Sequence, residues 1–194
     1  MRPPGTVPLP RRFYHRTAQE LAPLLLNKLL VAPDGRAGRI VEVEAYSEDD
    51  PASHSHRGRT TRNATMFGPP GHLYVYFTYG MHWCANAVCG APDDGTAVLL
   101  RALEPVAGLE KMRLARPAAR TDRDLCRGPA RLAQALGIDG EADGSDLVHG
   151  PFRILDDGVN PPPRPTTTTR VGITRAKELP WRWYVPGSRY VSRP

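Results

Sequence analysis

Cysteine and long hydrophobic runs are both scarce in this sequence of 194 residues. The three cysteines, Cys84, Cys89 and Cys126, are odd in number and form no CxxC pair, which argues against a disulfide framework and a four-ligand zinc site. No apolar segment approaches the roughly 18 residues that a membrane-spanning helix needs, and the opening segment MRPPGTVPLPRR lacks the hydrophobic region of a signal peptide. We therefore expect a cytoplasmic protein with no membrane partner.

Lysine is scarce as well, since Lys28, Lys111 and Lys177 are the only lysines among 26 basic residues. The formal net charge of +6 favours a polyanionic partner, and arginine suits bidentate contacts with phosphate groups. Many basic proteins bind no polyanion, however, and an arginine bias can follow from genome composition. The composition alone leaves both readings open.

Local patterns predict a mixture of helices and strands. The segment RTAQELAPLLLNKLL has helical character, with Thr17 as N-cap and Glu20 completing a capping box. The segment GRIVEVEAY alternates as a strand, and residues 47–71 read as a long functional loop or short helices. We further expect strands or extended segments in CANAVC, TAVLLRALEP, VGIT and RWYVPGSRYVS, and helices in VAGLEKMRLAR and RGPARLAQALGI.

The order of these elements predicts the fold class. Strands and helices mix without βαβ regularity and without an internal repeat, so we expect an α+β fold around a curved antiparallel sheet. We expect a flexible N-terminal arm over residues 1–12 and a single domain over residues 13–194. The stretch DDGVNPPPRPTTTTR should be an irregular excursion within that domain, because proline cannot occupy the interior of a regular element.

The stretch LYVYFTYGMHW concentrates aromatic residues. Buried phenols each require a hydrogen-bond partner, so a strand that only builds a core rarely carries so many. Gly80 can adopt the positive φ of a tight turn, which would place Tyr79 at the tip of a protruding β-hairpin. Alternation along the strand places Tyr74, Tyr76 and Thr78 on one face and Leu73, Val75 and Phe77, which we expect to pack on the core, on the other.

Three polar residues on the expected strands are candidates for chemistry. Glu44 and Tyr46 share one face, where a carboxylate and a phenol could activate a water beside an aromatic ligand. Strand alternation by itself favours a solvent-exposed face that carries Glu42 and Glu44. Arg101 ends an apolar run abruptly, so it either delivers a guanidinium to a site or forms a structural ion pair with Glu42 or Glu104.

The loop HSHRGRTTRNATMF offers a different set of side chains. His54 and His56 form an HxH pair, but no further ligand follows at useful spacing, so the signal for a metal is weak. Arg57, Arg59 and Arg62 fit phosphate contacts better, with a solvated loop as the alternative.

Several motifs in order carry a resemblance. The segments GRIVEVEAY, ASHS, RN, MF, G-HLYVYFTYGMHWCANAV, AVLLRALEP, RGPARLAQALGI and RVGI together resemble the alkyladenine (3-methylpurine) DNA glycosylase family. The resemblance implies a base-excision repair enzyme that binds duplex DNA and flips an alkylated or deaminated purine into a pocket. Such an enzyme hydrolyses the N-glycosidic bond of that purine and leaves an abasic site.

The resemblance also implies roles for individual residues. Glu44 corresponds to the general base, and Arg101 with the backbone carbonyl of Val171 to the groups that hold the attacking water. Tyr79 corresponds to the side chain that enters the minor groove and fills the gap left by the flipped nucleotide. The remaining correspondences are a base pocket of Tyr46, His54, Tyr76, Asn86 and Val171, and DNA-backbone contacts at Arg57, Arg59, Arg62 and Met81.

The expected enzyme is a monofunctional, metal-independent monomer, associated with the nucleoid and without a cofactor. An enzyme that also cleaves the strand needs an amine for a Schiff base, and no lysine lies near the Glu44 strand or the aromatic strand in sequence. Two alternatives remain open at this point. One is a catalytically silent nucleic-acid-binding protein that uses the same basic surface and tyrosine hairpin, and the other is a metal-dependent hydrolase that uses His54, His56 and a cysteine.

Overall fold

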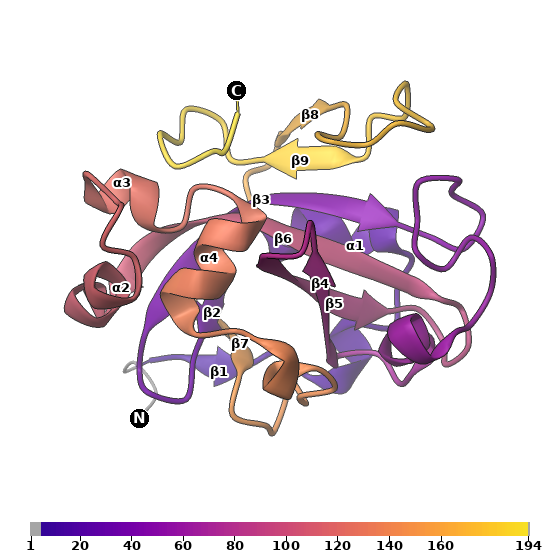
Figure 1. Cartoon of the computed structure of the whole chain (residues 1–194), viewed down its shortest axis with the longest axis horizontal. Helices are drawn as coiled ribbons and strands as arrows, with labels where there is room; N and C mark the ends of the chain where they lie inside the picture. Colours follow the sequence, from indigo (N-terminus) through magenta and orange to yellow (C-terminus); the bar gives the residue numbers. More distant parts are fainter. Residues whose placement is uncertain (1–4, 194) are drawn as a thin grey trace.

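The computed structural model describes residues 5–193, in which one antiparallel sheet of nine strands carries helices and long loops around it (Figure 1). The strands are β1 (Val7–Pro8), β2 (Leu29–Val31), β3 (Ala37–Tyr46), β4 (Leu73–Thr78), β5 (His82–Cys89), β6 (Thr96–Ala107), β7 (Arg153–Asp156), β8 (Thr166–Thr168) and β9 (Arg182–Tyr184). The main path runs β1-β7-β2-β3-β6-β5-β4, while β9 pairs with β3 and β8 pairs with β9. The α+β class is therefore confirmed.

In the described part of the chain, four α-helices and three short 3-10 helices surround the sheet. The α-helices are α1 (Ala18–Leu25), α2 (Leu109–Ala115), α3 (Asp122–Leu125) and α4 (Pro129–Leu136), and the 3-10 helices are Arg11–Phe13, Thr61–Phe67 and Gly140–Ala142. The β4–β5 hairpin lies between α4 on one side and the loop and 3-10 helix of residues 47–67 on the other (Figure 1). No helix within residues 5–193 is long and apolar enough to cross a membrane.

Strand β3 is held along both of its edges. One edge pairs with β6 over almost its whole length, and the other pairs first with β2 and then, at residues 42–44, with β9. The register between β3 and β6 shifts three times, and two of these shifts, next to Glu42, leave Val41 on β3 and Arg101 on β6 without a direct partner. Such bulges re-aim side chains and occur often beside active sites. They lie where Glu42, Glu44 and Arg101 meet.

The core lies between the sheet and the helices. Val43 and Ala45 of β3 and Leu100 of β6 are fully buried there with Leu21 and Leu25 of α1. Thr17 caps α1 with the expected capping box, in which its hydroxyl accepts from the Glu20 N–H and the Glu20 carboxylate accepts from the Thr17 N–H. This reciprocal satisfaction of the first-turn donors fixes where α1 begins.

Three expectations about local structure were wrong. The expected loose arm contains β1, which pairs with β7, and Leu9, which is buried; residues 1–4 lie outside the described part of the chain. The expected helix over RTAQELAPLLLNKLL ends at Leu25, because Asn27 has a positive φ of 66° and the following residues form β2. The Pro/Thr stretch contains a short strand, β8, where its threonines pair with β9.

The aromatic strand follows the expected alternation except at its end. Leu73 and Val75 are buried in the core, while Tyr74, Tyr76 and Thr78 face a cavity on the other side. Phe77 does not pack on the core. It is 43% exposed and lies against Trp83 of β5, with ring centroids 4.8 Å apart. At Phe77 the hairpin extends beyond the rest of the sheet, so a side chain on this face has no core to pack against.

Candidate active site

A cavity of about 590 Å³ opens between the β4–β5 hairpin and the segment of residues 171–175. This size is typical of sites for small molecules and cofactors. The structure brings together most of the candidate site residues in its walls: Tyr46, His54, Tyr76, Tyr79, Asn86, Arg101 and Val171. The sequence reasoning missed other wall residues, among them Pro51, Ala52, Met66, Cys84 and Leu99.

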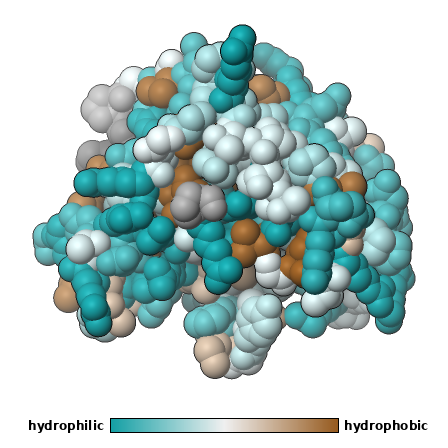
Figure 2. Space-filling view, turned by 90° about the horizontal axis from the view of Figure 1, so that it is seen from above, coloured by the Kyte–Doolittle hydropathy of each residue, from teal (hydrophilic) through white to brown (hydrophobic). Residues whose placement is uncertain are grey.

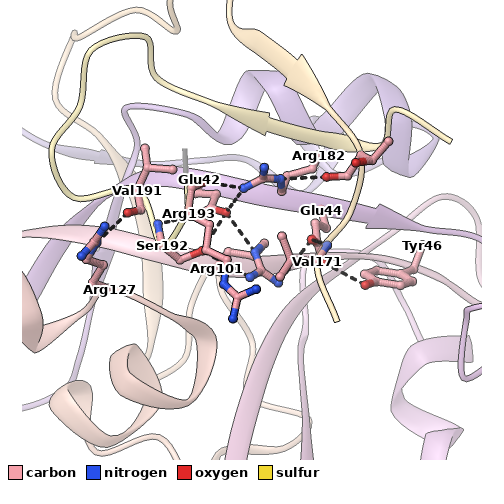
Figure 3. Close-up of polar contacts among 11 residues, drawn as sticks. Glu42, Glu44, Tyr46, Arg101, Arg127, Val171, Arg182, Val191, Ser192 and Arg193 are labelled. Carbon is pink, nitrogen blue, oxygen red and sulfur yellow. Dashed lines mark hydrogen bonds and ion pairs between the residues drawn. The ribbon is translucent and has the colours of Figure 1, made fainter. Parts of the chain in front are cut away.

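Glu44 lies directly behind this wall, with no exposed surface. Its Oε1 accepts a hydrogen bond from the Val171 backbone N–H at 2.8 Å and lies 3.2 Å from Arg101 Nη1. Its Oε2 accepts a hydrogen bond from the Tyr46 hydroxyl at 2.9 Å (Figure 3). The three donor residues all line the cavity. The carboxylate is thus fixed at the cavity wall by neighbours from β3, β6 and the segment after β8.

The burial of Glu44 sets its protonation chemistry. Desolvation raises the pKa of Glu44, opposed by the charge of Arg101 and by the hydrogen bonds from Val171 and Tyr46. Burial also raises the pKa of Tyr46, and the neighbouring Glu44 carboxylate raises it further. Tyr46 therefore stays protonated and continues to donate to Glu44. A raised carboxyl pKa moves a group toward the range useful for general-base catalysis near neutral pH.

Arg101 forms ion pairs with two buried carboxylates. Its Nε lies 3.0 Å from Glu42 Oε1 and its Nη1 lies 3.2 Å from Glu44 Oε1. Glu42 and Glu44 are both fully buried, so the alternative of a solvent-exposed acidic face is wrong. The two roles considered for Arg101, a structural ion pair and a group of the site, are compatible, because the residue that pairs with Glu42 also lines the cavity.

The opposite part of the cavity is aromatic. The rings of His54 and Tyr76 meet edge to face with centroids 4.4 Å apart, and His54 Nδ1 lies 3.0 Å from the Tyr74 hydroxyl. Partial desolvation at the cavity, with the nearby charge of Arg62, lowers the pKa of His54, which favours its neutral imidazole. Asn86 is buried and donates from Nδ2 to the Tyr74 carbonyl at 3.1 Å. This set of flat and polar groups fits a planar heterocycle.

Tyr79 and Gly80 form the turn of the hairpin. Both have positive φ, 52° and 66°, as in the two-residue turns that match the twist of antiparallel strands. Tyr79 is 80% exposed and Met81 is 68% exposed. A non-glycine residue with positive φ is uncommon and carries some strain, which the sequence reasoning did not foresee for Tyr79. The turn presents a large side chain at the mouth of the cavity.

The arginine loop lies on the surface near the same hairpin. Arg57, Arg59 and Arg62 are all exposed. Arg59 pairs with Asp93 at 3.2 Å, while Arg62 donates to the Phe77 carbonyl at 2.9 Å. The face that carries the C-terminal segment is mostly hydrophilic, with small separate hydrophobic areas (Figure 2). The exposed arginines of this loop are thus available beside the hairpin for an anionic partner.

No group of three or more histidine, cysteine, aspartate or glutamate side chains suited to a metal occurs within residues 5–193. His54 and His56 use their Nδ1 atoms elsewhere, His54 with Tyr74 and His56 with the Glu48 carbonyl at 3.2 Å. All three cysteines are buried free thiols.

A further buried ion pair, which the sequence did not reveal, supports the wall of the cavity. Asp50 and Arg170 have fully buried side chains, and Arg170 Nη2 donates to Asp50 Oδ1 at 2.9 Å. The Arg170 guanidinium also lies over the Tyr46 ring, 4.7 Å from its centroid. In the sequence, the only indication of a role for Arg170 is its position directly before the site residue Val171. The pair ties the loop after β3 to the segment that contacts Glu44.

Comparison with known proteins gives a consistent result. The family model described as methylpurine-DNA glycosylase matches residues 12–189. A protein of Burkholderia lata named "Putative 3-methyladenine DNA glycosylase" is 64% identical over 194 residues, which cover 98% of this chain and 93% of that protein. Proteins with the same name from Rhodopseudomonas palustris and Methanoculleus marisnigri are each 50% identical, over 98% and 95% of this chain and 94% and 98% of their own lengths.

Proposed function

This chain belongs to the methylpurine-DNA glycosylase family, and we propose from that premise that it hydrolyses the N-glycosidic bond of alkylated or deaminated purines in duplex DNA. The observation that carries the proposal is the Glu44 carboxylate, buried and held by Arg101, Tyr46 and the Val171 N–H at the wall of an aromatic cavity. A DNA-binding protein without catalysis has no evident need for such a carboxylate.

Glu44 is the proposed general base. A carboxylate has about four lone-pair positions, and Val171, Arg101 and Tyr46 occupy three of them. The remaining position is free to accept a proton from a water that enters the cavity beside Arg101. The water oxygen bonds to C1′ of the deoxyribose as the bond from C1′ to the purine nitrogen breaks. The bonding electrons leave with the purine, and the water proton passes to Glu44.

The substrate itself supplies much of the driving force. A purine alkylated at N3 or N7 is cationic, so it is already a good leaving group and one carboxylate suffices where glycosidases usually need two. The aromatic faces of Tyr46 and Tyr76 attract a cationic ring by about 0.5–2 kcal/mol. This attraction favours damaged bases over neutral normal ones. Deaminated, neutral purines depend more on hydrogen bonds from His54 and Asn86.

Flipping is assigned to the hairpin. Extrusion of a base costs a few kcal/mol, least where pairing is already weakened by damage. The exposed Tyr79 at the turn is proposed to enter the minor groove and fill the vacated space, which offsets part of this cost. Arg57, Arg59, Arg62 and Met81 are proposed to contact the DNA backbone.

Further properties belong to the same proposal. The enzyme is monofunctional and needs no metal or cofactor, and it acts as a monomer in the cytoplasm, associated with the nucleoid. Support for water as the nucleophile comes from the cavity, whose walls within residues 5–193 include no lysine.

A panel of duplex oligonucleotides tests the proposed function. Each duplex carries one 3-methyladenine, 7-methylguanine, hypoxanthine or ethenoadenine, and abasic sites are scored by alkaline cleavage. We expect excision of at least one of the cationic methylpurines, with intact strands before alkali. Tight binding to these duplexes without any excision would instead support the silent nucleic-acid-binding alternative.

A further inference from the structure

A second carboxylate holds the side of the Arg101 guanidinium that faces away from Glu44. The Oε1 atom of Glu42 accepts hydrogen bonds from Arg101 Nε at 3.0 Å and from Arg182 Nη1 at 2.9 Å (Figure 3). Arg101 therefore lies between two fully buried carboxylates, and Arg182 supplies a second positive charge that balances them. Glu42 does not line the cavity, so it acts through Arg101 and not on a ligand.

Ser192, close to the C-terminus, completes this cluster. Its backbone N–H donates to Glu42 Oε2 at 2.6 Å, and its hydroxyl donates to Glu42 Oε1 at 2.9 Å. The same Ser192 Oγ accepts a hydrogen bond from Arg101 Nη2 at 3.2 Å. Each of the three guanidinium nitrogens of Arg101 thus has its own partner: Nε has Glu42, Nη1 has Glu44 and Nη2 has Ser192.

Two further arginines fix the backbone on either side of Ser192. Arg127 Nε donates to the Val191 carbonyl at 2.8 Å, and Arg182 Nη1 donates to the Arg193 carbonyl at 2.7 Å (Figure 3). Val191 is also buried. Residues 191–193 are therefore anchored at several points, which gives the Ser192 hydroxyl a defined place.

We propose that Glu42 and Ser192 are positioning residues, which hold the Arg101 guanidinium so that its Nη1 stays against the Glu44 carboxylate. A planar guanidinium held at three nitrogens cannot turn about its last bonds without losing a charge-assisted hydrogen bond. The inference rests on the proposed function, in which ionised Glu44 accepts the proton of the attacking water. It gives the C-terminal segment an indirect role in that step, because Ser192 positions Arg101.

The position of Arg101 controls how readily Glu44 ionises. Among the charged neighbours of Glu44, Arg101 favours the carboxylate most, whereas burial and the like charge of Glu42 oppose ionisation and raise the pKa of Glu44. The titratable and charged groups that face Glu44 come from five parts of the chain: Glu42 and Tyr46 of β3, Tyr76 of β4, Cys84 of β5, Arg101 of β6, and Arg170 of the segment after β8. A less constrained Arg101 would stabilise the carboxylate less.

Ser192→Ala is the sharpest variant for this proposal. It removes one hydroxyl and no charge, and it leaves the backbone hydrogen bond to Glu42. The result of Glu42→Gln would be harder to interpret. Loss of the like charge of Glu42 would by itself lower the pKa of Glu44, and the two buried arginines would at the same time lose a counter-charge. Loss of one hydrogen bond to a charged group predicts about a tenfold slower single-turnover excision for Ser192→Ala. The acid limb of its pH–rate profile should move to higher pH.

Two matched variants complete the experiment. Ser192→Thr keeps a hydroxyl and should restore most of the rate and the wild-type pH profile. Ser188→Ala removes a hydroxyl from the same C-terminal region, where it only accepts a hydrogen bond from the Tyr190 N–H at 3.3 Å. This variant should behave as the wild type. If Ser192→Ala matched Ser188→Ala in rate and pH profile, the positioning role of Ser192 would be overturned.

A titration of Glu44 separates this inference from the proposed function. Carbon-13 NMR of protein labelled at glutamate carboxyls follows Glu44 directly, with the resonance assigned by its loss in Glu44→Gln. We expect a higher Glu44 pKa in Ser192→Ala than in the wild type, whether or not the protein excises a purine. An unchanged Glu44 titration would overturn the inference even if the rate fell. Wild-type protein that excised no modified purine would defeat the proposed function alone.

Discussion

The Nη1 atom of Arg101 lies 3.2 Å from Oε1 of Glu44, and neither side chain has more than a small contact with solvent. Water screens such a pair little, so each charge strongly affects the protonation of the other. Arg101 thereby opposes the effect of burial, which raises the pKa of Glu44. The charge of Arg101 thus helps to keep the buried Glu44 carboxylate ionised, so that it can accept a proton from a water in the cavity.

The pH dependence of excision should reveal this carboxylate. Burial raises the pKa of Glu44, so the rate should fall with decreasing pH at a higher pH than an ordinary glutamate would give. The measurement is single-turnover excision of 7-methylguanine across pH 4 to 9 (about the range in which carboxylates and imidazoles titrate), with the acid limb of the profile reporting on Glu44. A rate that stayed constant down to the ordinary glutamate pKa would contradict the assignment.

The same shift predicts a stability effect with a definite sign. Because the folded state holds the Glu44 proton more tightly than the unfolded chain, the contribution of this group to the free energy of unfolding falls as pH rises through the raised pKa. Glu44→Gln lacks this titration. The wild type should therefore lose stability relative to the variant as pH rises across that window, as measured by urea unfolding at several pH values. A difference independent of pH would argue against a raised pKa.

Tyr79→Ala should separate binding from stability. Tyr79 is 80% exposed, so its truncation should change the free energy of unfolding by less than about 0.5 kcal/mol. Excision from duplex DNA should nevertheless fall, because no side chain would fill the space left by the flipped base. Leu114→Ala, at an 82% exposed position on α2, is the matched control and should excise normally. Equal duplex activity in both variants would remove the intercalation role from Tyr79.

The buried pair Asp50–Arg170 should matter far more for stability than an exposed pair. Arg170→Gln leaves a buried carboxylate without its counter-charge, which typically costs about 3–5 kcal/mol. Arg59→Gln breaks the exposed pair with Asp93 and should cost at most about 1 kcal/mol. Urea unfolding of the two variants checks this, and similar losses in both would contradict the structural role of Asp50–Arg170.

Schiff-base chemistry should be absent. Lys28 is buried and pairs with Asp156 at 2.8 Å, while Lys111 lies near Asp34 at 3.6 Å. None of the three lysines, Lys177 included, lines the cavity. Incubation of damaged duplex with the protein and borohydride should therefore yield no covalent adduct, while a known bifunctional glycosylase under the same conditions serves as positive control. A trapped adduct would show that an amine of this protein attacks the sugar.

Features that depend on neighbouring residues were predictable from the sequence. The capping box of Thr17 and Glu20 needs only residues within one turn, and the tight turn at Tyr79-Gly80 needs only a glycine and two flanking strands. Both were predicted at the correct positions. The strand that carries Glu44 was also predicted, because the alternation from Ile40 to Tyr46 is sufficient to define a strand.

Features that depend on distant segments were not predictable. Residues 29–31 continue a helical pattern, yet they form β2 because the backbone of β7, far along the chain, offers a partner. The alternation around Glu42 and Glu44 also fitted an exposed face, because the groups that cover those carboxylates include β9 and residues 171 and 192, which are distant in the sequence. The Arg182 and Ser192 contacts carry no local pattern at all. Contacts between segments distant in the sequence determine the structure at these residues, and the local pattern of a single sequence carries no information about such contacts.

The most direct test of the central claim compares wild-type protein with Glu44→Gln on duplex DNA that contains one methylated purine. We expect wild-type protein to generate alkali-labile abasic sites, and to do so equally with EDTA present. Glu44→Gln should bind the same duplex with similar affinity but excise at least about a hundredfold more slowly, as loss of a general base predicts. Excision by Glu44→Gln at the wild-type rate would contradict the assignment of Glu44 as the base.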